Sequence, residues 1–297
     1  MQKEQSLGRE FAAEVVGTFF LVFFGTGSVF VGAITGALQG LLQVAVVWGL
    51  AIALAIYSVG AISGAHLNPA VTIAVAFLRD FPKRKVLPYI VAQLAGAMIA
   101  SAVLYFLFSG VVTSFEKEKG IVRREPGSER SAMIFGEYFP NPAALGTDAA
   151  SMAKVSEIQA MLAEALGTAL LVFFIFALTD TRNRNRPDGT LYAVFIGLTI
   201  TVLISVIAPL TQAGFNPARD FAPRLFSYFA GWGKIAIPGP RGGFFTVYIL
   251  SPIVGGLIGG LIYDFVIQPR AVEAPAASGR VSVDGKGLVT ETTPAEV

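Results

Sequence analysis

Long apolar runs separated by short polar stretches dominate the chain. A helix rises about 1.5 Å per residue, so about 20 apolar residues are needed to cross the hydrocarbon core of a membrane, which is ~30 Å thick. Six runs reach that length, at approximately residues 11–33, 41–60, 86–109, 158–179, 190–209 and 245–266. The pattern therefore predicts an all-α membrane protein with six transmembrane helices.

Two further stretches are too short to cross. HLNPAVTIAVAFL follows the second run, and NPARDFAPRLFSYF follows the fifth. About 12 helical residues reach only ~18 Å, so each stretch is expected to enter the membrane halfway as a re-entrant half-helix. The predicted fold is six transmembrane helices plus two re-entrant half-helices.

The two halves of the chain carry the same elements in the same order. AEVVGTFFLVFF surrounds Glu14, and AEALGTALLVFF surrounds Glu164. An ionisable group inside an apolar span is costly enough to indicate a structural or functional role. We expect both glutamates to brace the re-entrant loops by accepting backbone N–H bonds. Because three spans per half is an odd number, the second half should be inverted in the membrane.

This repeat predicts one domain over residues 1–267 and a short extension. The expected parts are repeat one at about 8–109, an external loop at about 110–157, repeat two at about 158–267 and a disordered cytoplasmic tail at 268–297. The loops after spans two and four carry the basic residues Lys83, Arg84, Lys85, Arg182, Arg184 and Arg186. Basic loops stay in the cytoplasm, so a multi-pass protein of the cell membrane with both termini cytoplasmic is expected.

Composition narrows the chemistry. The chain is 54% hydrophobic and 14% charged, as expected for a membrane protein. It has no cysteine and one histidine, which removes thiolate sites and most zinc and triad chemistry. A net charge of +2 gives no reason to expect nucleic acid. Because no nucleophile–base pair or metal-ligand cluster is visible, we expect neither an enzyme nor a cofactor or metal site.

The tripeptide Asn-Pro-Ala begins both half-helices, as Asn68, Pro69 and Ala70 and again as Asn216, Pro217 and Ala218. Asn is a preferred N-cap and Pro a preferred first helical residue. Two such starts in inverted halves predict half-helices that meet head to head. A third copy begins at Asn141 in a polar loop, with no apolar helix directly behind it. We interpret that copy as coincidental turn chemistry.

The segments before each tripeptide should line a water-filled passage, because irregular backbone at membrane depth is tolerated only there or when buried in protein. Their carbonyls are expected to form a ladder of acceptors for a solute with hydroxyl groups, at Gly64, Ala65, His66, Leu67, Gly214 and Phe215. The opposed half-helix dipoles and the amides of Asn68 and Asn216 should oppose cations and protons. Arg219 would add donors to the passage. The side chain of His66 either lines the passage or is a satisfied buried histidine.

At SGAHLNPAVT and GFNPARDFAPR the chain resembles the major intrinsic proteins, that is, the aquaporins and glycerol facilitators, over about residues 8–267. Asp220, directly after Arg219, resembles the glycerol-facilitating branch. The resemblance implies a right-handed aquaporin-like bundle that assembles in the lipid bilayer as a homotetramer with a pore in each protomer.

The family also implies a selectivity filter, which falls by distance from the motifs on Trp48, Ile204, Ala213 and Arg219. Glycerol facilitators usually have an aromatic residue in place of Ala213 and a small one in place of Ile204, so the set is closer to nodulin-like plant channels. The resemblance implies a passive channel for glycerol and small uncharged solutes, with some water. Arsenous or boric acid, urea and water are alternative permeants. An ion-coupled inverted-repeat transporter is the alternative from another class.

Overall fold

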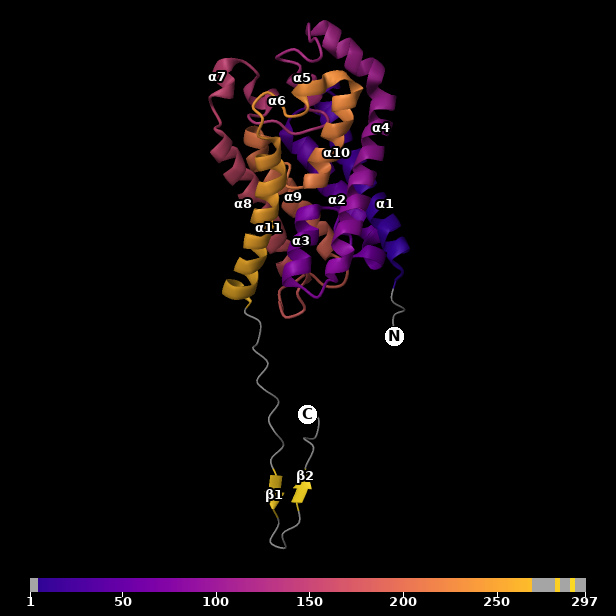
Figure 1. Cartoon of the computed structure of the whole chain (residues 1–297), viewed down its shortest axis with the longest axis vertical. Coiled ribbons are helices and arrows are strands. Elements are labelled where there is room, and N and C mark those ends of the chain that lie inside the picture. The colour runs from indigo at the N-terminus through magenta and orange to yellow at the C-terminus, as the bar shows by residue number, and fades with distance from the viewer. Residues whose placement is uncertain (1–4, 269–280, 284–288, 292–297) are drawn as a thin grey trace.

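The computed structural model describes residues 5–268, 281–283 and 289–291 (Figure 1). In this part of the chain, six helical segments are long and apolar enough to span a membrane. They are α1 (Leu7–Phe30) continued by η1 (Val31–Thr35), α2 (Leu41–Ser63), η2 (Lys83–Lys85) with α4 (Val86–Glu118), α8 (Glu157–Thr179), α9 (Tyr192–Thr211), and η5 (Thr246–Leu250) with α11 (Ser251–Ile262) and η6 (Tyr263–Ile267). The six predicted spans are confirmed.

Two half-length helices complete the bundle, α3 (Pro69–Leu78) and α10 (Pro217–Ser227). Figure 1 shows α3 in the lower half of the bundle and α10 in the upper half. Each begins as the sequence predicts. The side-chain oxygen of Asn68 accepts the N–H of Ala70, that of Asn216 accepts the N–H of Ala218, and a proline follows each asparagine. Local capping chemistry therefore sets where both half-helices start.

The inverted repeat is visible in the packing. Helix α1 packs on α2 and α4, and its counterpart α8 packs on α9 and α11. The halves join where α2 crosses α9, with Gly49 against Gly197. A Cβ atom on either glycine would clash with the backbone of the other, so this crossing needs two residues without side chains. These glycines are 148 residues apart (197 − 49), the same spacing as Asn68 and Asn216 (216 − 68).

The connection between α4 and α8, here called the outer loop, differs from the bounds expected for the external loop. Helix α4 ends at Glu118, nine residues beyond the predicted 109 (118 − 109), because the helix continues past its apolar part. The shortened connection holds three short helices, α5 (Glu129–Ala132), α6 (Pro142–Leu145) and α7 (Ala149–Met152). Arg123 holds this connection in place. Its Nε donates to Glu116 at 2.9 Å, and its guanidinium carbon lies 3.8 Å from the centre of the Trp232 ring. After α10, η3 (Tyr228–Trp232) and η4 (Gly233–Ile235) complete this end.

The opposite end holds the start of α1, the end of η6 and the basic loops (Figure 1). Lys85 donates to Glu10 at 2.9 Å, and Arg79 pairs with Asp264, so the connection between α3 and α4 is tied to the first turn of α1 and to η6. Beyond residue 268, where the sequence predicts a disordered tail, the structure describes two antiparallel strands, β1 (Val281–Val283) and β2 (Val289–Glu291). The rest of that prediction lies outside the described residues.

Candidate functional site

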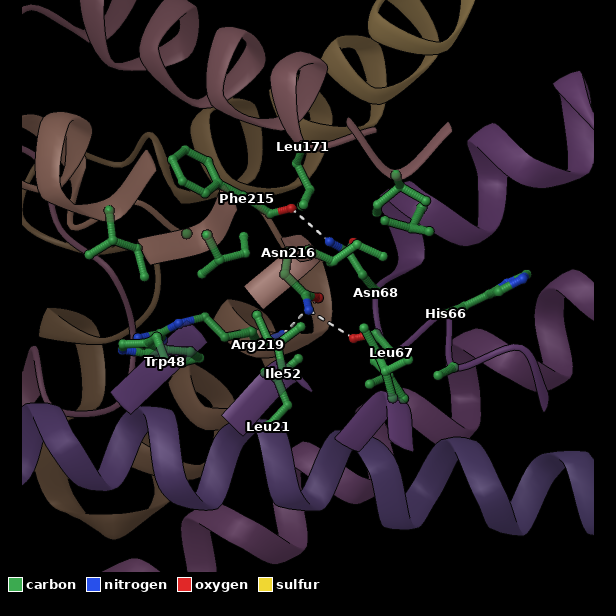
Figure 2. Close-up of a pocket in the computed structure, with 18 of the residues that line it drawn as sticks. Leu21, Trp48, Ile52, His66, Leu67, Asn68, Leu171, Phe215, Asn216 and Arg219 are labelled. Atoms are coloured by element: carbon green, nitrogen blue, oxygen red, sulfur yellow. Dashed lines mark hydrogen bonds between the residues drawn. The ribbon is translucent and has the colours of Figure 1, made fainter. Parts of the chain in front are cut away.

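The two half-helices meet through reciprocal hydrogen bonds at the centre of the bundle (Figure 2). The amide nitrogen of Asn68 donates to the carbonyl of Phe215 at 2.9 Å, and that of Asn216 donates to the carbonyl of Leu67 at 2.8 Å. Each asparagine thus caps its own half-helix with its oxygen and holds the opposite loop with its nitrogen. One N–H of each amide is committed to the protein, so only the second is left for a solute.

The backbone before each half-helix turns through a left-handed conformation. Leu67 has φ +53° and Phe215 has φ +52°, a region that residues with side chains adopt only with support. This geometry directs successive carbonyls along the passage, where a regular helix would pair them with its own N–H groups.

Two buried carboxylates support these strained loops. Glu14 accepts the N–H groups of His66 at 2.9 Å and Leu67 at 2.8 Å. Glu164 accepts those of Gly214 at 3.0 Å and Phe215 at 2.7 Å. Further donors are Ser63 and Gln93 at Glu14 and Thr211 at Glu164, so Glu14 accepts four hydrogen bonds and Glu164 three. Neither side chain is exposed, so both glutamates act on the loops and not on a solute.

The loops line a central cavity of about 130 Å³ whose wall combines apolar side chains with polar groups. Most of the apolar side chains come from α1, α2, α8 and α9, and most of the polar groups come from the loops and α10. The predicted residues on its wall are Trp48, Gly64, Ala65, His66, Leu67, Asn68, Ile204, Ala213, Gly214, Phe215, Asn216 and Arg219. Residues 150 positions apart in the chain are thereby brought to one passage.

A second cavity, of about 340 Å³, lies at the end where the outer loop covers the bundle. It has three residues in common with the central cavity: Trp48, Ile204 and Arg219. Ala213 lines only the central cavity, and Gln212 only the outer one. Three of the four predicted filter residues therefore lie at the junction between the two cavities, and Ala213 lies on its central side.

The guanidinium group of Arg219 is held on three sides. Its Nη1 donates to the carbonyl of Phe135 at 3.0 Å, its centre lies 4.6 Å from the Trp48 ring, and it forms an ion pair with Glu137. Sequence reasoning missed Glu137. The available signal was a carboxylate inside the apolar stretch AMIFGEYFP of the outer loop. This carboxylate explains how a cation can sit in the first turn of a helix, at the positive end of its dipole.

A second ion pair lies directly behind the first. Asp220 pairs with Arg224 at 2.9 Å and accepts the backbone N–H of Glu137 at 2.7 Å. All four charged side chains are buried, and the two positive and two negative charges sum to zero. The network ties α10 to the outer loop and leaves the junction without net charge.

Both His66 and the third Asn-Pro-Ala copy, at Asn141, make defined contacts within the protein. The His66 ring packs 4.7 Å from Phe81 and 5.1 Å from Tyr89, at the inner end of the central cavity. Asn141 begins the four-residue helix α6 by the same capping chemistry as the other copies, and its amide donates to the carbonyl of Ala208 at 2.8 Å. It lines the outer cavity, away from the point where the half-helices meet.

A charged, open hollow of about 530 Å³ lies beside the ends of α3 and α8. Arg182 donates to Asp180 through two nitrogens and lowers the pKa of Asp180 to about 2. The carboxylate therefore stays ionised at physiological pH. Within the described residues, no group of three or more His, Cys, Asp or Glu side chains is arranged to hold a metal ion.

The chain is similar to known proteins along most of its length. It is 41% identical over 270 residues to the glycerol uptake facilitator protein of Shigella flexneri, covering 90% of this chain and 91% of that protein. It is 42% identical to the glycerol uptake facilitator protein of Pseudomonas aeruginosa, with 91% and 93% covered. To the propanediol uptake facilitator of Salmonella typhimurium it is 41% identical, with 88% and 95% covered.

The fold has a solved counterpart. The X-ray structure of the aquaglyceroporin from Plasmodium falciparum matches with a TM-score of 0.75 and 26% identity, over 88% of this chain and 97% of that one. The family model described as major intrinsic protein matches residues 1–263. The reciprocal contacts of Asn68 and Asn216, the two braced loops and these similarities agree, and the chain belongs to the major intrinsic protein family.

Proposed function

We propose that this protein is a passive transmembrane channel for glycerol and other small uncharged solutes, with some water permeation, and that it does no chemistry on them. The observation that carries this proposal is the mixed lining of the passage, which combines apolar side chains with hydrogen-bonding groups. Trp48 and Ile204 offer an apolar edge, and Arg219 with the loop carbonyls offers a polar one. A polyol has the same two edges, because its carbon backbone lies on one side and its hydroxyl groups on the other. Relatives named as facilitators of glycerol and propanediol uptake support the proposal.

The selectivity filter in this proposal is the junction of Trp48, Ile204 and Arg219, with Ala213 directly inside it. Ile204 brings no hydrogen-bond donor, and Ala213 leaves room beside Arg219. Selectivity in such a passage depends on its diameter and on the donors and acceptors of its wall. This set favours a solute wider and less polar than water alone.

Ions and protons are excluded mainly by the half-helices. Each directs a partial positive charge of about half an elementary unit at the centre, where a cation would have to lose its water. Arg219 contributes donors, but its charge is compensated by Glu137 and the filter is close to neutral. We therefore assign the cation barrier to the helix ends and the asparagine amides.

Two alternatives remain distinguishable. Arsenous or boric acid, urea and water would fit the same passage as small neutral solutes. An ion-coupled transporter would need free coordinating groups at mid-depth, and there Glu14 and Glu164 each already accept two backbone N–H groups of the loops. A flux that neither saturates steeply nor responds to an ion gradient separates a channel from a transporter.

We further propose that four copies assemble as a homotetramer in the cell membrane, the inner membrane in bacteria, with both termini in the cytoplasm. Basic residues of the η2 and α8–α9 loops lie at the end of the bundle where α1 begins and η6 ends, which agrees with the preference of basic loops for the cytoplasmic side. Cross-linking in native membranes tests the tetramer, and protease accessibility of a terminal tag tests the orientation.

The decisive experiment is light scattering from proteoliposomes challenged with glycerol, water, urea and arsenous acid in turn. We expect vesicles with the protein to equilibrate with glycerol much faster than empty vesicles, without an imposed ion gradient. Glycerol permeability equal to that of empty vesicles would refute the main proposal. Faster entry of arsenous acid or urea than of glycerol would favour the alternative solutes.

A further inference from the structure

The indole of Trp48 lies in a slot of helix α1 that exists because residue 25 is glycine. A Cβ atom added to Gly25 would overlap three atoms of the benzene part of the ring, Cε3, Cζ3 and Cδ2. Such an overlap is not relieved by bending a flexible chain end, since an indole is rigid and moves as one body. The ring can lie where it does only while α1 offers no side chain at this position.

Gly25 lies behind the ring as seen from the passage. Trp48 lines both cavities, whereas Gly25 lines neither. On the other side of the ring, the guanidinium centre of Arg219 lies 4.6 Å away (Figure 2). Arg219 is itself fixed by Phe135 and Glu137. A ring displaced from α1 therefore moves into the junction, towards a partner that cannot retreat.

The internal repeat shows what replaces this slot in the other half. After the shared LVFF, the chain has Gly25 in the first repeat and Ile175 in the second, 150 residues later (175 − 25). The counterpart of Trp48, before the paired glycine of the helix crossing, is Ile196, 148 residues later (196 − 48). Ile175 packs against the cluster that contains Ile196, and both line the central cavity. Where α8 carries the side chain of Ile175, the corresponding residue of α9 is Ile196 and not an aromatic residue.

We propose that Gly25 is a specificity-determining position of this channel, although it touches no solute. By leaving room for the indole of Trp48, it sets the opening beside the stacked pair of Trp48 and Arg219 and so the size of the polyol that passes. The inference rests on the proposed function, because it needs the junction to be the filter. Within that function it assigns the control of width to a helix that contributes no side chain to the filter.

The test compares Gly25→Ala with Gly27→Ala in proteoliposomes, with glycerol and water permeabilities divided by the amount of folded protein. Gly27 lies on the same helix, and a Cβ there would meet only Cδ2 of Leu104, at 3.3 Å. We expect Gly25→Ala to lower the ratio of glycerol to water permeability by about tenfold, the effect of ~1.4 kcal/mol on a barrier. Gly27→Ala should leave the ratio unchanged. Adding Trp48→Phe to Gly25→Ala, which shortens the ring, should restore glycerol permeation.

Each outcome of this test either supports or contradicts the role proposed for Gly25. An unchanged ratio in Gly25→Ala, or a loss that Trp48→Phe does not rescue, overturns the proposal. If neither the single nor the double variant folds, Gly25 serves the packing of α1 on α2, and the proposal is again wrong. The wild-type protein tests the proposed function separately. Absence of glycerol flux there refutes the channel, whereas normal wild-type flux with an unaltered variant refutes only the role of Gly25.

Discussion

The carboxylate of Glu137 forms an ion pair with the guanidinium of Arg219, and the two side chains are 0% and 4% exposed. One comes from the outer loop and the other from the first turn of α10, so the pair joins segments 82 residues apart (219 − 137). Buried ions are tolerated when they are paired and hydrogen-bonded. The pair gives the filter an arginine that can donate hydrogen bonds without carrying a net charge into the passage.

Breaking this pair should destabilise the protein. Glu137→Gln leaves Arg219 buried and uncompensated, which costs about 3–5 kcal/mol for a buried pair. We expect a clear fall in the thermal unfolding temperature in detergent. Glu125→Gln, which changes an exposed carboxylate of the same loop, is the control and should have no effect. The double variant Glu137→Gln with Arg219→Gln should regain part of the loss, and purely additive effects would argue against the pair.

The loop before Asn216 should depend on Glu164. Glu164→Gln replaces one acceptor oxygen by a donor that faces the N–H groups of Gly214 or Phe215. Each hydrogen bond lost there costs about 1–3 kcal/mol, so we expect poor folding and loss of solute flux. Glu157→Gln on the same helix concerns a single side-chain donor, the Thr246 hydroxyl, which the amide oxygen can still accept, and it should be much milder. Equal effects of the two substitutions would show that Glu164 is not a special brace.

Larger side chains in the space beside Arg219 should close the filter to glycerol. Ile204→His with Ala213→Phe places a donor and a ring beside Arg219, and narrowing selects for water. We expect glycerol permeability to fall by about tenfold or more, ~1.4 kcal/mol of barrier, with water flux largely kept. Stopped-flow light scattering in both solutes measures the change. Full glycerol flux in the double variant would place the filter elsewhere.

The third Asn-Pro-Ala copy should matter for stability and not for selectivity. Asn141→Ala removes a helix cap and the bond to the carbonyl of Ala208. Loss of a cap costs about 1 kcal/mol, so the outer loop should become easier to cleave by protease while the ratio of glycerol to water permeability is unchanged. Asn185→Ala, at an exposed site of the opposite end, serves as the control. An altered ratio in Asn141→Ala would show that the loop contributes to the filter.

Local signals predicted the elements well. The six spans follow from the length of apolar runs, and the starts of α3 and α10 follow from Asn and Pro at capping positions. The end of α4 at Glu118 was missed because hydropathy stops at the membrane surface, whereas a helix continues as long as its backbone pairs and its polar side chains find partners such as Arg123.

The contacts of the site were less predictable, because each depends on residues far apart in the chain. The repeat around Glu14 and Glu164 indicated that both glutamates support the loops, and the structure gives the individual N–H groups. The sequence placed the asparagine amides at the barrier to cations but indicated no protein partner for them. In the structure each amide donates one N–H to a carbonyl of the opposite half, 2.9 Å away for Asn68 and 2.8 Å for Asn216.

By itself, the sequence determined the number of spans, the inverted repeat, the capped half-helices and the family, because these follow from runs, spacings and short motifs that act over a few neighbouring residues. Only the tertiary structure decided which carboxylate faces Arg219 and which glycine lies behind Trp48. Those relations depend on how two halves of the chain fold against each other, and a carboxylate in a loop or a glycine in a helix carries no local mark of its distant partner.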